Sequence, residues 1–397
     1  MIEITKEISL IANYLEGKKI ALGITGSIAA FEAIKISREL RRFGAKVKPY
    51  FSKNAKYFIT ETSIEWATNE KPVTELSGLS EHLLDEDLFL ICPATANIIA
   101  KLNHGIADDV VSTKAIYAEG KGIPIVIAPA MHINMYKNKT VQKNIKDLKK
   151  RGYFFIEPRI NENAAKLAKK ENIIPFVIRL LSKGPLKNKK VLITAGPTRE
   201  YIDQVRFITN MSTGKLGVRI AKEFYLRGAD VTLIYGRGYE KPPDYLKIIN
   251  IVTTKDMLNA VLNEINKKYD IGIFAGAVSD FTIESFKNEK ISSKKVPEIK
   301  LKKTKKIVKE VSKHPKKPFS VDFKLEYNKK EKELLNCALK LLKENNADLV
   351  IANDLKQIRS GKHIAYIIDP KGNYTKVFSK DEIAVTLVNE IEKRIKK

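Results

Sequence analysis

The chain has 397 residues, and 72 Lys and Arg against 46 Asp and Glu give a formal net charge of +26. This length predicts two or three domains. A hydrophobic fraction of 44% is enough for a packed core and excludes wholesale disorder.

The basic composition leaves three interpretations open: a nucleic-acid partner, a solvated lysine-rich surface, or attraction for small phosphorylated ligands. The lysines are spread along the whole chain and are densest at 287–317. No zinc-ligand spacing, aromatic RNA-binding signature or helix-turn-helix pattern accompanies them. We therefore expect small-molecule substrates and no nucleic acid.

Membrane and secreted classes are also disfavoured. No apolar run reaches the roughly 20 residues of a membrane span, and acidic residues within the first seven positions argue against a signal peptide. The two cysteines, Cys92 and Cys337, lie in apolar strand and helix patterns and do not indicate a disulfide framework. A cytoplasmic protein with no membrane association is expected.

The first half opens with a β-α-β pattern. An apolar strand at 20–24 is followed by a Gly-Ser turn and by a helix with apolar residues at Ile28, Phe31, Ile34, Ile36 and Leu40. Gly44 ends this helix, and a second strand starts at Lys46.

The second half repeats this plan. A strand begins at 189, an insertion covers 199–217, a helix covers 218–226, and another strand follows at 231–235. The stretch 182–190 contains Gly-Pro and four lysines without periodicity, which indicates a linker. We predict two doubly wound α/β domains, 1–185 and 186–397, with ligands at the carboxyl ends of the strands.

Small and polar residues gather at four predicted strand ends of the first half. The segment 23–29 (GITGSIA) opens a helix whose amides suit a phosphate, although its spacing is not that of a dinucleotide fingerprint. Similar segments are 92–97 (CPATAN), 108–113 (DDVVST) and 128–136 (APAMHINMY). Taken singly, the first segment is equally compatible with a tight turn alone, and an ordinary loop is the better interpretation of each of the other three.

Taken together, these segments resemble the flavin-containing cysteine-decarboxylase family, which binds FMN in a flavodoxin-like fold. The resemblance covers the whole first half. It implies that FMN is bound by Gly26, Ser27, Ile28, Ser52, Pro93, Ala94, Thr95, Asn97, Ser112, Thr113, Ala130 and Met131.

The same resemblance assigns catalytic roles. His82 occupies the place of the family's histidine base, and a near-neutral imidazole suits proton removal. Bacterial members have Asn directly after Pro-Ala-Met; here His132 follows, with Asn134 two residues on, and either holds the substrate carboxylate. The expected flap, 157–168, lacks the cysteine that returns a proton in those members. The proton donor therefore stays unassigned, and residues 161–163 are candidates to close the flap.

The second half carries its own strand-end motifs: 194–200 (TAGPTRE), 206–217 (RFITNMSTGKLG), 275–281 (AGAVSDF) and 352–354 (AND). The second motif is not a Walker A loop, because Thr209 and Leu216 stand where Gly and Ser or Thr are required. Asp280 at a strand end is suited to Mg²⁺ on nucleotide phosphates. Lys290 is a candidate to neutralise a transferring phosphate, or is ordinary solvated charge.

In combination these motifs look like phosphopantothenate–cysteine ligases, from about residue 190 to the end of the chain. The resemblance implies that Asn210 stabilises an acyl-nucleotide intermediate, that Lys290 assists its formation, and that Mg²⁺ lies at Asp280. It implies nucleotide contacts at Gly196, Ser212, Gly214, Ala275, Gly276, Ala277, Asp280, Lys290, Phe323, Lys340, Lys343 and Asn353.

Joined in one chain, the two halves resemble the bifunctional enzymes of coenzyme A biosynthesis. The resemblance implies CTP-dependent ligation of cysteine to 4′-phosphopantothenate, then FMN-dependent decarboxylation of the product to 4′-phosphopantetheine. It also implies homo-oligomers, with trimers or dodecamers through the first domain and dimers through the second. Two alternatives stay open: an FMN enzyme of the flavin prenyltransferase type, and a non-catalytic flavin-binding regulatory protein.

Overall fold

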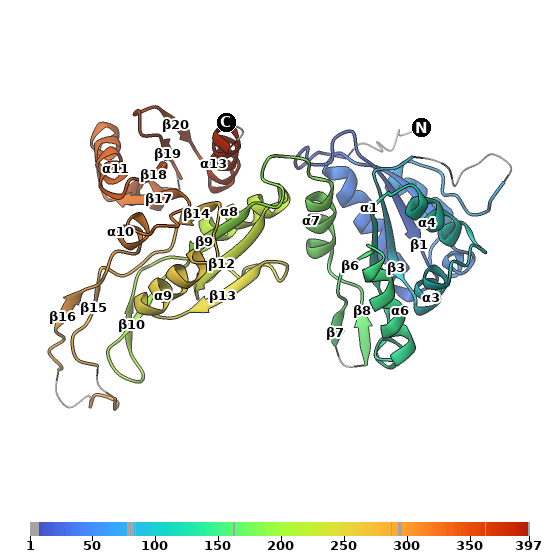
Figure 1. Ribbon diagram of the computed structural model, residues 1–397, viewed down its shortest axis with the longest axis horizontal. Coiled ribbons are helices and arrows are strands. Elements are labelled where there is room, and N and C mark those ends of the chain that lie inside the picture. The colour runs from blue at the N-terminus through green and yellow to red at the C-terminus, as the bar shows by residue number, and fades with distance from the viewer. Residues whose placement is uncertain are drawn as a thin grey trace. The chain divides into compact units, whose positions relative to one another are not determined.

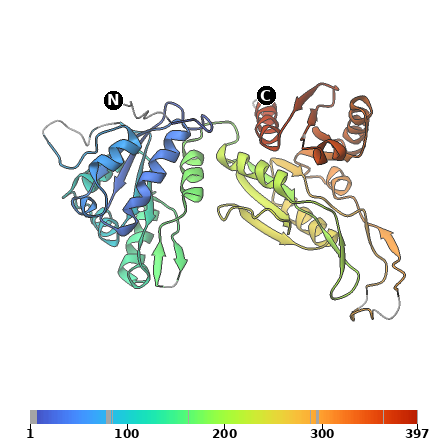
Figure 2. The same cartoon turned by 180° about the vertical axis from the view of Figure 1, so that it is seen from behind.

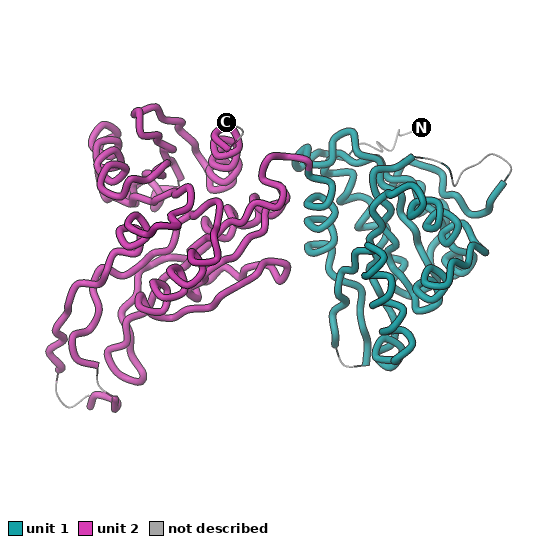
Figure 3. Tube along the Cα trace, viewed as in Figure 1, with its two compact units in different colours: residues 1–182 teal, residues 183–397 magenta. Residues whose placement is uncertain are grey.

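The computed structural model describes residues 8–77, 83, 85–161, 163–286, 288–292, 296–361 and 363–395. The chain divides into two compact units, Met1–Ser182 (unit 1) and Lys183–Lys397 (unit 2), which Figure 3 colours separately. Within the described ranges, every helix falls short of the length or hydropathy needed to cross a bilayer.

Unit 1 is built on a five-stranded sheet in which all neighbours are parallel. Its central strands are buried from end to end, as expected for a sheet covered on both faces. The order β2-β1-β3-β4-β6 is that of flavodoxin-like folds. The chain first adds β2 on one side of β1 and then adds β3, β4 and β6 on the other side, so strand order reverses between β1 and β3. The strands are β1 Lys19–Ile24, β2 Lys46–Phe51, β3 Leu88–Ala94, β4 Ile125–Pro129 and β6 Phe154–Phe155.

Helices cover both faces of this sheet (Figures 1 and 2). One face packs against α3, α4 and α6 through a shared apolar cluster. On the other face α1 contacts both α2 and α7. The helices are α1 Glu32–Arg42, α2 Glu61–Thr68, α3 Ala96–His104, α4 Val110–Gly120, α6 Lys139–Lys150 and α7 Lys170–Leu181.

The start of the first helix differs from the sequence prediction. Residues Ile28–Phe31 form a separate 3₁₀ turn, η1, and the α-helix begins only at Glu32. Ile28 is 74% exposed and Phe31 is 47% exposed, so the first two predicted apolar positions do not face the core. The core face of α1 consists of Ala33, Ile36, Ser37 and Leu40.

Unit 2 contains an eight-stranded sheet with the order β13-β12-β9-β14-β17-β18-β19-β20. The first six are parallel and follow the strand order of Rossmann sheets, with the reversal between β9 and β14; β19 and β20 are antiparallel additions. The strands are β9 Lys190–Ala195, β12 Asp230–Gly236, β13 Lys247–Ile251, β14 Ile271–Phe274, β17 Phe319–Glu326, β18 Leu349–Asp354, β19 Ala365–Ile368 and β20 Tyr374–Val377.

Side chains of β9 alternate between two cores. Val191 and Ile193 pack in a cluster with α8 (Lys215–Leu226) and α13 (Lys380–Ile395). Leu192 packs on the opposite face with α9 (Thr254–Ile265) and α10 (Ile307–Ser312). On that face α11 (Glu331–Asn345) contacts β17, β18 and α10, and the short α12 (Leu355–Arg359) follows β18. The predicted class, two doubly wound α/β units, is confirmed.

Two antiparallel ribbons extend from the strand ends of unit 2 (Figures 1 and 2). One is the hairpin β10 (Arg199–Tyr201) and β11 (Phe207–Thr209), which lies within the predicted insertion. The other pairs β15 (Phe281–Ile283) with β16 (Leu301–Lys303). β10 contacts β15, so the two ribbons lie side by side.

Helix α8 approaches β9 so closely that Gly217 has no room for a side chain: a Cβ there would lie 2.4 Å from the Cβ of Ala195. We expect Gly217→Ala to destabilise unit 2 by roughly 1–3 kcal/mol, because α8 must move away from the sheet. Urea unfolding monitored for each unit measures the effect.

The matched control is Gly120→Ala at the end of α4, where an added Cβ meets nothing within 4 Å. Alanine is the better helix former, so this variant should be neutral or stabilising by up to about 1 kcal/mol. Equal effects of the two substitutions would contradict the close packing of α8 on β9.

Candidate functional site

In unit 1 strand order reverses between β1 and β3, and a buried threonine joins the two strands at their carboxyl ends. Thr25 directly follows β1 and is 2% exposed. Its Oγ1 donates a hydrogen bond to the carbonyl oxygen of Pro93, at 2.8 Å, and accepts one from the amide of Thr95, at 3.2 Å. The hydroxyl therefore joins the first strand to the loop across the reversal point, where flavodoxin-like folds bind their ligand.

The predicted loop residues surround this bridge. Ser27 caps η1 and accepts from the amide of Ala29, while Thr95 caps α3. Gly26 permits close approach of the next loop, since a Cβ there would lie 2.5 Å from the Cβ of Asn54. Ser52 is buried at the end of β2, and the exposed Ile28 offers apolar surface for a flat ligand.

Two predicted flavin contacts, Ser112 and Thr113, lie in the first turn of α4 and differ in their hydrogen bonding. Ser112 is fully buried and forms a capping box with Asp109, so its hydroxyl is already bonded to protein. The Oγ1 of Thr113 is buried and has no hydrogen-bond partner among the described residues. An orphaned buried hydroxyl suits a polar group of a bound ligand, so this residue fits a flavin site.

The segment after β4 joins the predicted substrate residues to the predicted flap. Ala130 donates its amide hydrogen bond to the carbonyl oxygen of Ala94. Met131–His132 then forms β5, which pairs with β8 (Ala164–Lys166) of the β7–β8 hairpin; β7 is Arg159–Asn161. The exposed His132 accepts at Nδ1 from the amide of Asn134, at 3.3 Å. His132 thus belongs to the same small sheet as the hairpin, and Asn134 follows it in the short helix α5 (Ile133–Tyr136).

Other predicted residues of unit 1 lie on the edges of this arrangement. Pro93 and Ala94 end β3 and are buried, and Asn97 is exposed in the first turn of α3. Burial raises the pKa of the Cys92 thiol, and this residue lies in β3, away from the flap hairpin. His82, the predicted base, lies outside the described residues.

In unit 2, the ends of β9 and β14 are also joined by a threonine. Thr194 is 2% exposed, and its Oγ1 accepts from the amide of Gly276, at 3.1 Å. The amide of Ala277 donates to the carbonyl oxygen of Gly196, at 2.9 Å. Gly196 has a positive φ of 77°, and a Cβ there would lie 1.8 Å from the oxygen of Gly236, so only glycine fits.

Asn210 follows β11 and reaches the same loop. Its Nδ2 donates to the carbonyl oxygens of Ala277 and Val278, each at 3.1 Å. Ser212 and Gly214 come next and lead into α8; Gly214 has a φ of 77° and lies against the ring of Tyr235. Three of the four predicted ligase motifs therefore meet at the carboxyl ends of β9 and β14, while residues 352–354 lie in β18.

A cavity of about 430 Å³ lies beside these loops. Gly276, Asp280 and Phe323 of the predicted nucleotide set line it. Four lysines that the sequence analysis did not assign also line it: Lys305, Lys306, Lys309 and Lys324. The Nζ of Lys306 lies 2.5 Å from Asp280 Oδ1. In the sequence, the run of lysines just before α10 could have indicated a phosphate-binding surface. Such a run is equally typical of a solvated, lysine-rich surface.

The cavity also has a buried acidic group. Asp322 is 2% exposed, and its Oδ2 accepts a hydrogen bond from Asn345 Nδ2, at 2.8 Å. Burial raises the pKa of Asp322 to about 6, against the lowering effects of Asn345 and Lys317. Asp322 and Asn345 both line the cavity, so a carboxyl group with a pKa of about 6 faces the ligand space.

Each unit matches a known protein family. Residues 11–182 match the family described as Flavoprotein, and residues 186–395 match the DNA/pantothenate metabolism flavoprotein C-terminal domain. The coenzyme A biosynthesis bifunctional protein CoaBC of Thermococcus kodakarensis is 43% identical over 393 residues, 96% of this chain and 96% of that protein. The protein of the same name from Methanocaldococcus jannaschii is 39% identical over 389 residues, 96% of this chain and 95% of that protein.

This chain belongs to the CoaBC family. As a member, it is a bifunctional enzyme in which a decarboxylase flavoprotein domain is joined to a ligase domain. Among solved structures, the DNA/pantothenate metabolism flavoprotein from Streptococcus pneumoniae is 35% identical, with a TM-score of 0.48, and covers 52% of this chain and 99% of that one. The predicted family resemblance is confirmed.

Several residues that the resemblance assigned to the nucleotide are not among the residues that line the cavity. Lys340 is exposed and pairs with Glu344, at 3.8 Å, and Lys343 is also exposed; from α11 the cavity is lined by Leu341, Glu344 and Asn345. Asn353 is buried in β18, and Ala275 follows β14 directly. The exposed Lys290 is not a lining residue either.

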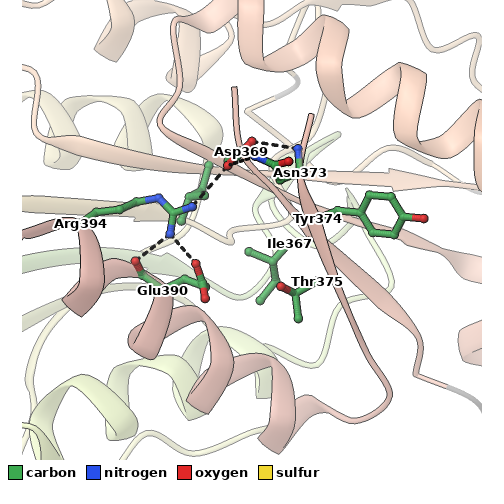
Figure 4. Close-up of a pocket in the computed structure, with 8 residues that line it drawn as sticks. Ile367, Asp369, Asn373, Tyr374, Thr375, Glu390 and Arg394 are labelled. Atoms are coloured by element: carbon green, nitrogen blue, oxygen red, sulfur yellow. Dashed lines mark hydrogen bonds and ion pairs between the residues drawn. The ribbon is translucent and has the colours of Figure 1, made fainter. Parts of the chain in front are cut away.

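A smaller cavity of about 70 Å³ near the β19–β20 turn has a structural explanation (Figure 4). Its polar side chains bond to one another: Arg394 pairs with Glu390 at 2.5 Å and with Asp369 at 3.6 Å, and Asp369 accepts from the side chain of Asn373. These groups hold the turn against α13. Among the described residues, no cluster of three His, Cys, Asp or Glu suited to a metal occurs.

Thr113 allows the flavin site to be tested. In flavin-free protein, Thr113→Val should leave the free energy of unfolding of unit 1 unchanged or slightly higher, because it removes an unpaired buried hydroxyl. Flavin affinity should fall about five- to tenfold, equivalent to one lost hydrogen bond. Titration of the flavin-free protein with FMN measures this, and Thr113→Ser is the control that keeps the hydroxyl. Unchanged affinity of the valine variant would remove Thr113 from the site.

The buried carboxyl of Asp322 predicts a specific pH dependence. Its pKa is about 6 in the folded protein, against an ordinary value of 3.8, so between these values the folded state holds a proton that the unfolded state has released. The stability contributed by this group is present at low pH and is lost as pH rises through 6. Asp322→Asn should therefore stabilise unit 2 by about 3 kcal/mol at pH 7 and very little at pH 4.

Urea unfolding of unit 2 at several pH values measures this difference. The control is Asp244→Asn, at a carboxylate that is 72% exposed, which should show no such pH-dependent gain. A gain for Asp322→Asn that is the same at pH 4 and pH 7 would contradict the raised pKa.

Proposed function

We propose that this chain converts 4′-phosphopantothenate and cysteine into 4′-phosphopantetheine in two consecutive steps. Unit 2 uses CTP to form an acyl-cytidylate with release of pyrophosphate, and the amine of cysteine then displaces CMP to form an amide. Unit 1 decarboxylates the resulting 4′-phosphopantothenoylcysteine. The observation that carries the proposal is 43% identity to a CoaBC protein over 96% of both chains, which includes both units.

The decarboxylation needs an electron acceptor. Direct loss of CO₂ from a cysteine carboxyl leaves an unstabilised carbanion, and FMN supplies the electron sink when it is bound. We assign His82 to proton removal and His132 or Asn134 to the substrate carboxylate. The pairing of β5 with the β7–β8 hairpin supports this assignment, because it joins the carboxylate-binding segment to the flap.

The ligation needs charge neutralisation at a triphosphate. The lysines at 305, 306, 309 and 324 line one cavity with Gly276 and Phe323, which supports nucleotide binding there. Mg²⁺ would take Asp280 together with oxygens of the phosphates, as is usual for this ion. Asn210, fixed on the loop after β14, would stabilise the acyl-nucleotide, and Lys290 would assist its formation.

Self-association is part of this proposal. The ribbons of unit 2 expose large apolar side chains: Val205 is 61% exposed, Phe286 50%, Val296 97% and Leu301 50%. Apolar surface of this kind favours an interface, so we propose a homodimer through unit 2. We also propose higher homo-oligomers through unit 1 and a cytoplasmic location for the enzyme.

The proposed reaction is tested with purified protein, FMN, phosphopantothenate, cysteine, CTP and Mg²⁺. Phosphopantetheine, CO₂, CMP and pyrophosphate are the expected products. Asn210→Asp should accumulate the acyl-cytidylate, and His82→Asn should release CMP normally but form phosphopantothenoylcysteine without CO₂. Absence of CMP and CO₂ from the wild type would contradict both activities, and a yellow protein without CO₂ release would favour a regulatory flavoprotein.

A further inference from the structure

The tip of the β10–β11 hairpin contains a buried carboxylate in an otherwise exposed ribbon. Asp203 is 0% exposed. Its Oδ1 accepts from the amides of Val205, at 2.8 Å, and Arg206, at 2.7 Å. Its Oδ2 accepts from Arg206 Nη1, at 2.8 Å. These three bonds are local and shape the hairpin turn. Asp203 also accepts a fourth hydrogen bond, from outside the hairpin.

The fourth donor comes from a distant segment. The amide of Ile291 donates to Asp203 Oδ2 at 3.1 Å, across 88 residues of sequence. Arg206 Nη1 in turn donates to the carbonyl oxygen of Ile291, at 3.2 Å. The Asp203–Arg206 pair therefore binds both backbone groups of one residue, as a neighbouring β-strand would.

A second contact from the hairpin binds the same segment three residues earlier, at Asn288. Gln204 Nε2 donates to Asn288 Oδ1 at 2.8 Å. Lys290 lies between the two anchored residues, Asn288 and Ile291. Residues 288–292 have no regular secondary structure, so these contacts supply order that the local backbone does not.

The side chain of Lys290 is left free by this arrangement. It is exposed and makes no hydrogen bond or ion pair with another residue in the described part of the chain. Burial of Asp203 opposes its ionisation, but the amides of Val205, Ile291 and Arg206 hold its pKa below the usual range. The carboxylate therefore remains an anionic acceptor at neutral pH while the lysine ammonium stays available to a ligand.

We propose that Asp203, with Arg206 and Gln204, is the positioning device for Lys290 in acyl-nucleotide formation. The inference rests on the proposed ligase function and adds the residues that fix the backbone beside the lysine. When a triphosphate binds to a lysine on an unanchored loop, the loop backbone loses conformational entropy, and this loss opposes binding. A backbone that is already anchored loses less on binding.

A double-mutant cycle tests this role. The variants are Asp203→Asn, Lys290→Ala and the pair, and the measured rate is steady-state pyrophosphate release with CTP, phosphopantothenate and cysteine all present. We expect Asp203→Asn to lower kcat about ten- to a hundredfold, the scale of a displaced catalytic group, with less than about a threefold change in the KM for CTP. In the Lys290→Ala background, the same substitution should change kcat less than about twofold.

Two controls separate positioning from general damage. Asp369→Asn removes another carboxylate of unit 2 that accepts backbone amides, those of Lys371 and Asn373 in the β19–β20 turn, and should leave kcat unchanged (Figure 4). Gln204→Ala removes only the Asn288 contact and should produce a smaller loss than Asp203→Asn.

Hydrogen exchange gives a readout that does not depend on activity. In Asp203→Asn, amides at 288–292 should exchange faster, while those of β9 and β14 remain protected. Unchanged exchange at 288–292 would overturn this inference, and so would equal rate losses from Asp203→Asn with and without Lys290. Neither outcome would contradict the proposed ligase function. A wild type that releases no pyrophosphate would overturn the proposed ligase function and this inference with it.

Discussion

In both units a buried threonine hydroxyl joins the first strand to the loop across the point where strand order reverses. Thr25 performs this role between β1 and β3, and Thr194 performs it between β9 and β14. Helices on opposite faces diverge at such a point, so backbone groups there lack the covering helix that would otherwise pair with them. A short side chain that can both donate and accept satisfies these groups without filling the space beyond the strand ends.

The loops that follow these strands then have little freedom. In unit 1, close approach of Gly26 to Asn54 and the caps by Ser27 and Thr95 fix the loops around the crevice. In unit 2, Gly196 passes so near the oxygen of Gly236 that no side chain fits, and Asn210 is bound to the loop after β14. In both sites the strand ends are thus held by hydrogen bonds and close backbone contacts.

Hydrogen-bonded polar groups of unit 2 divide into two kinds. The side chains around Arg394 and Asp369 bond to one another and hold a turn in place (Figure 4). Asp322 and Asn345 bond to one another but also face the cavity, and Asp203 binds a segment that carries a free lysine. Satisfied polar groups are structural when all their partners are local, and they bear on function when they face ligand space or a reactive side chain.

The sequence by itself determined the two α/β halves, the strand ends at which their motifs lie, and the family. Periodicity and glycine positions report the local backbone, and a set of strand-end motifs in series is specific. It was wrong about the helix at 28–31, because apolar spacing alone does not tell a 3₁₀ turn with exposed Ile28 from the first turn of a core helix. It also gave no means of selecting Lys305 and Lys306 from among 72 basic residues.

Only the tertiary structure decided which distant residues meet. The contacts of Thr25 with Pro93, Thr194 with Gly276, and Asp203 with Ile291 span 68, 82 and 88 residues. Side-chain pattern specifies the face of an element on which a residue lies, but a hydrogen bond between elements depends on strand order and register, which are set by the packing of the whole sheet.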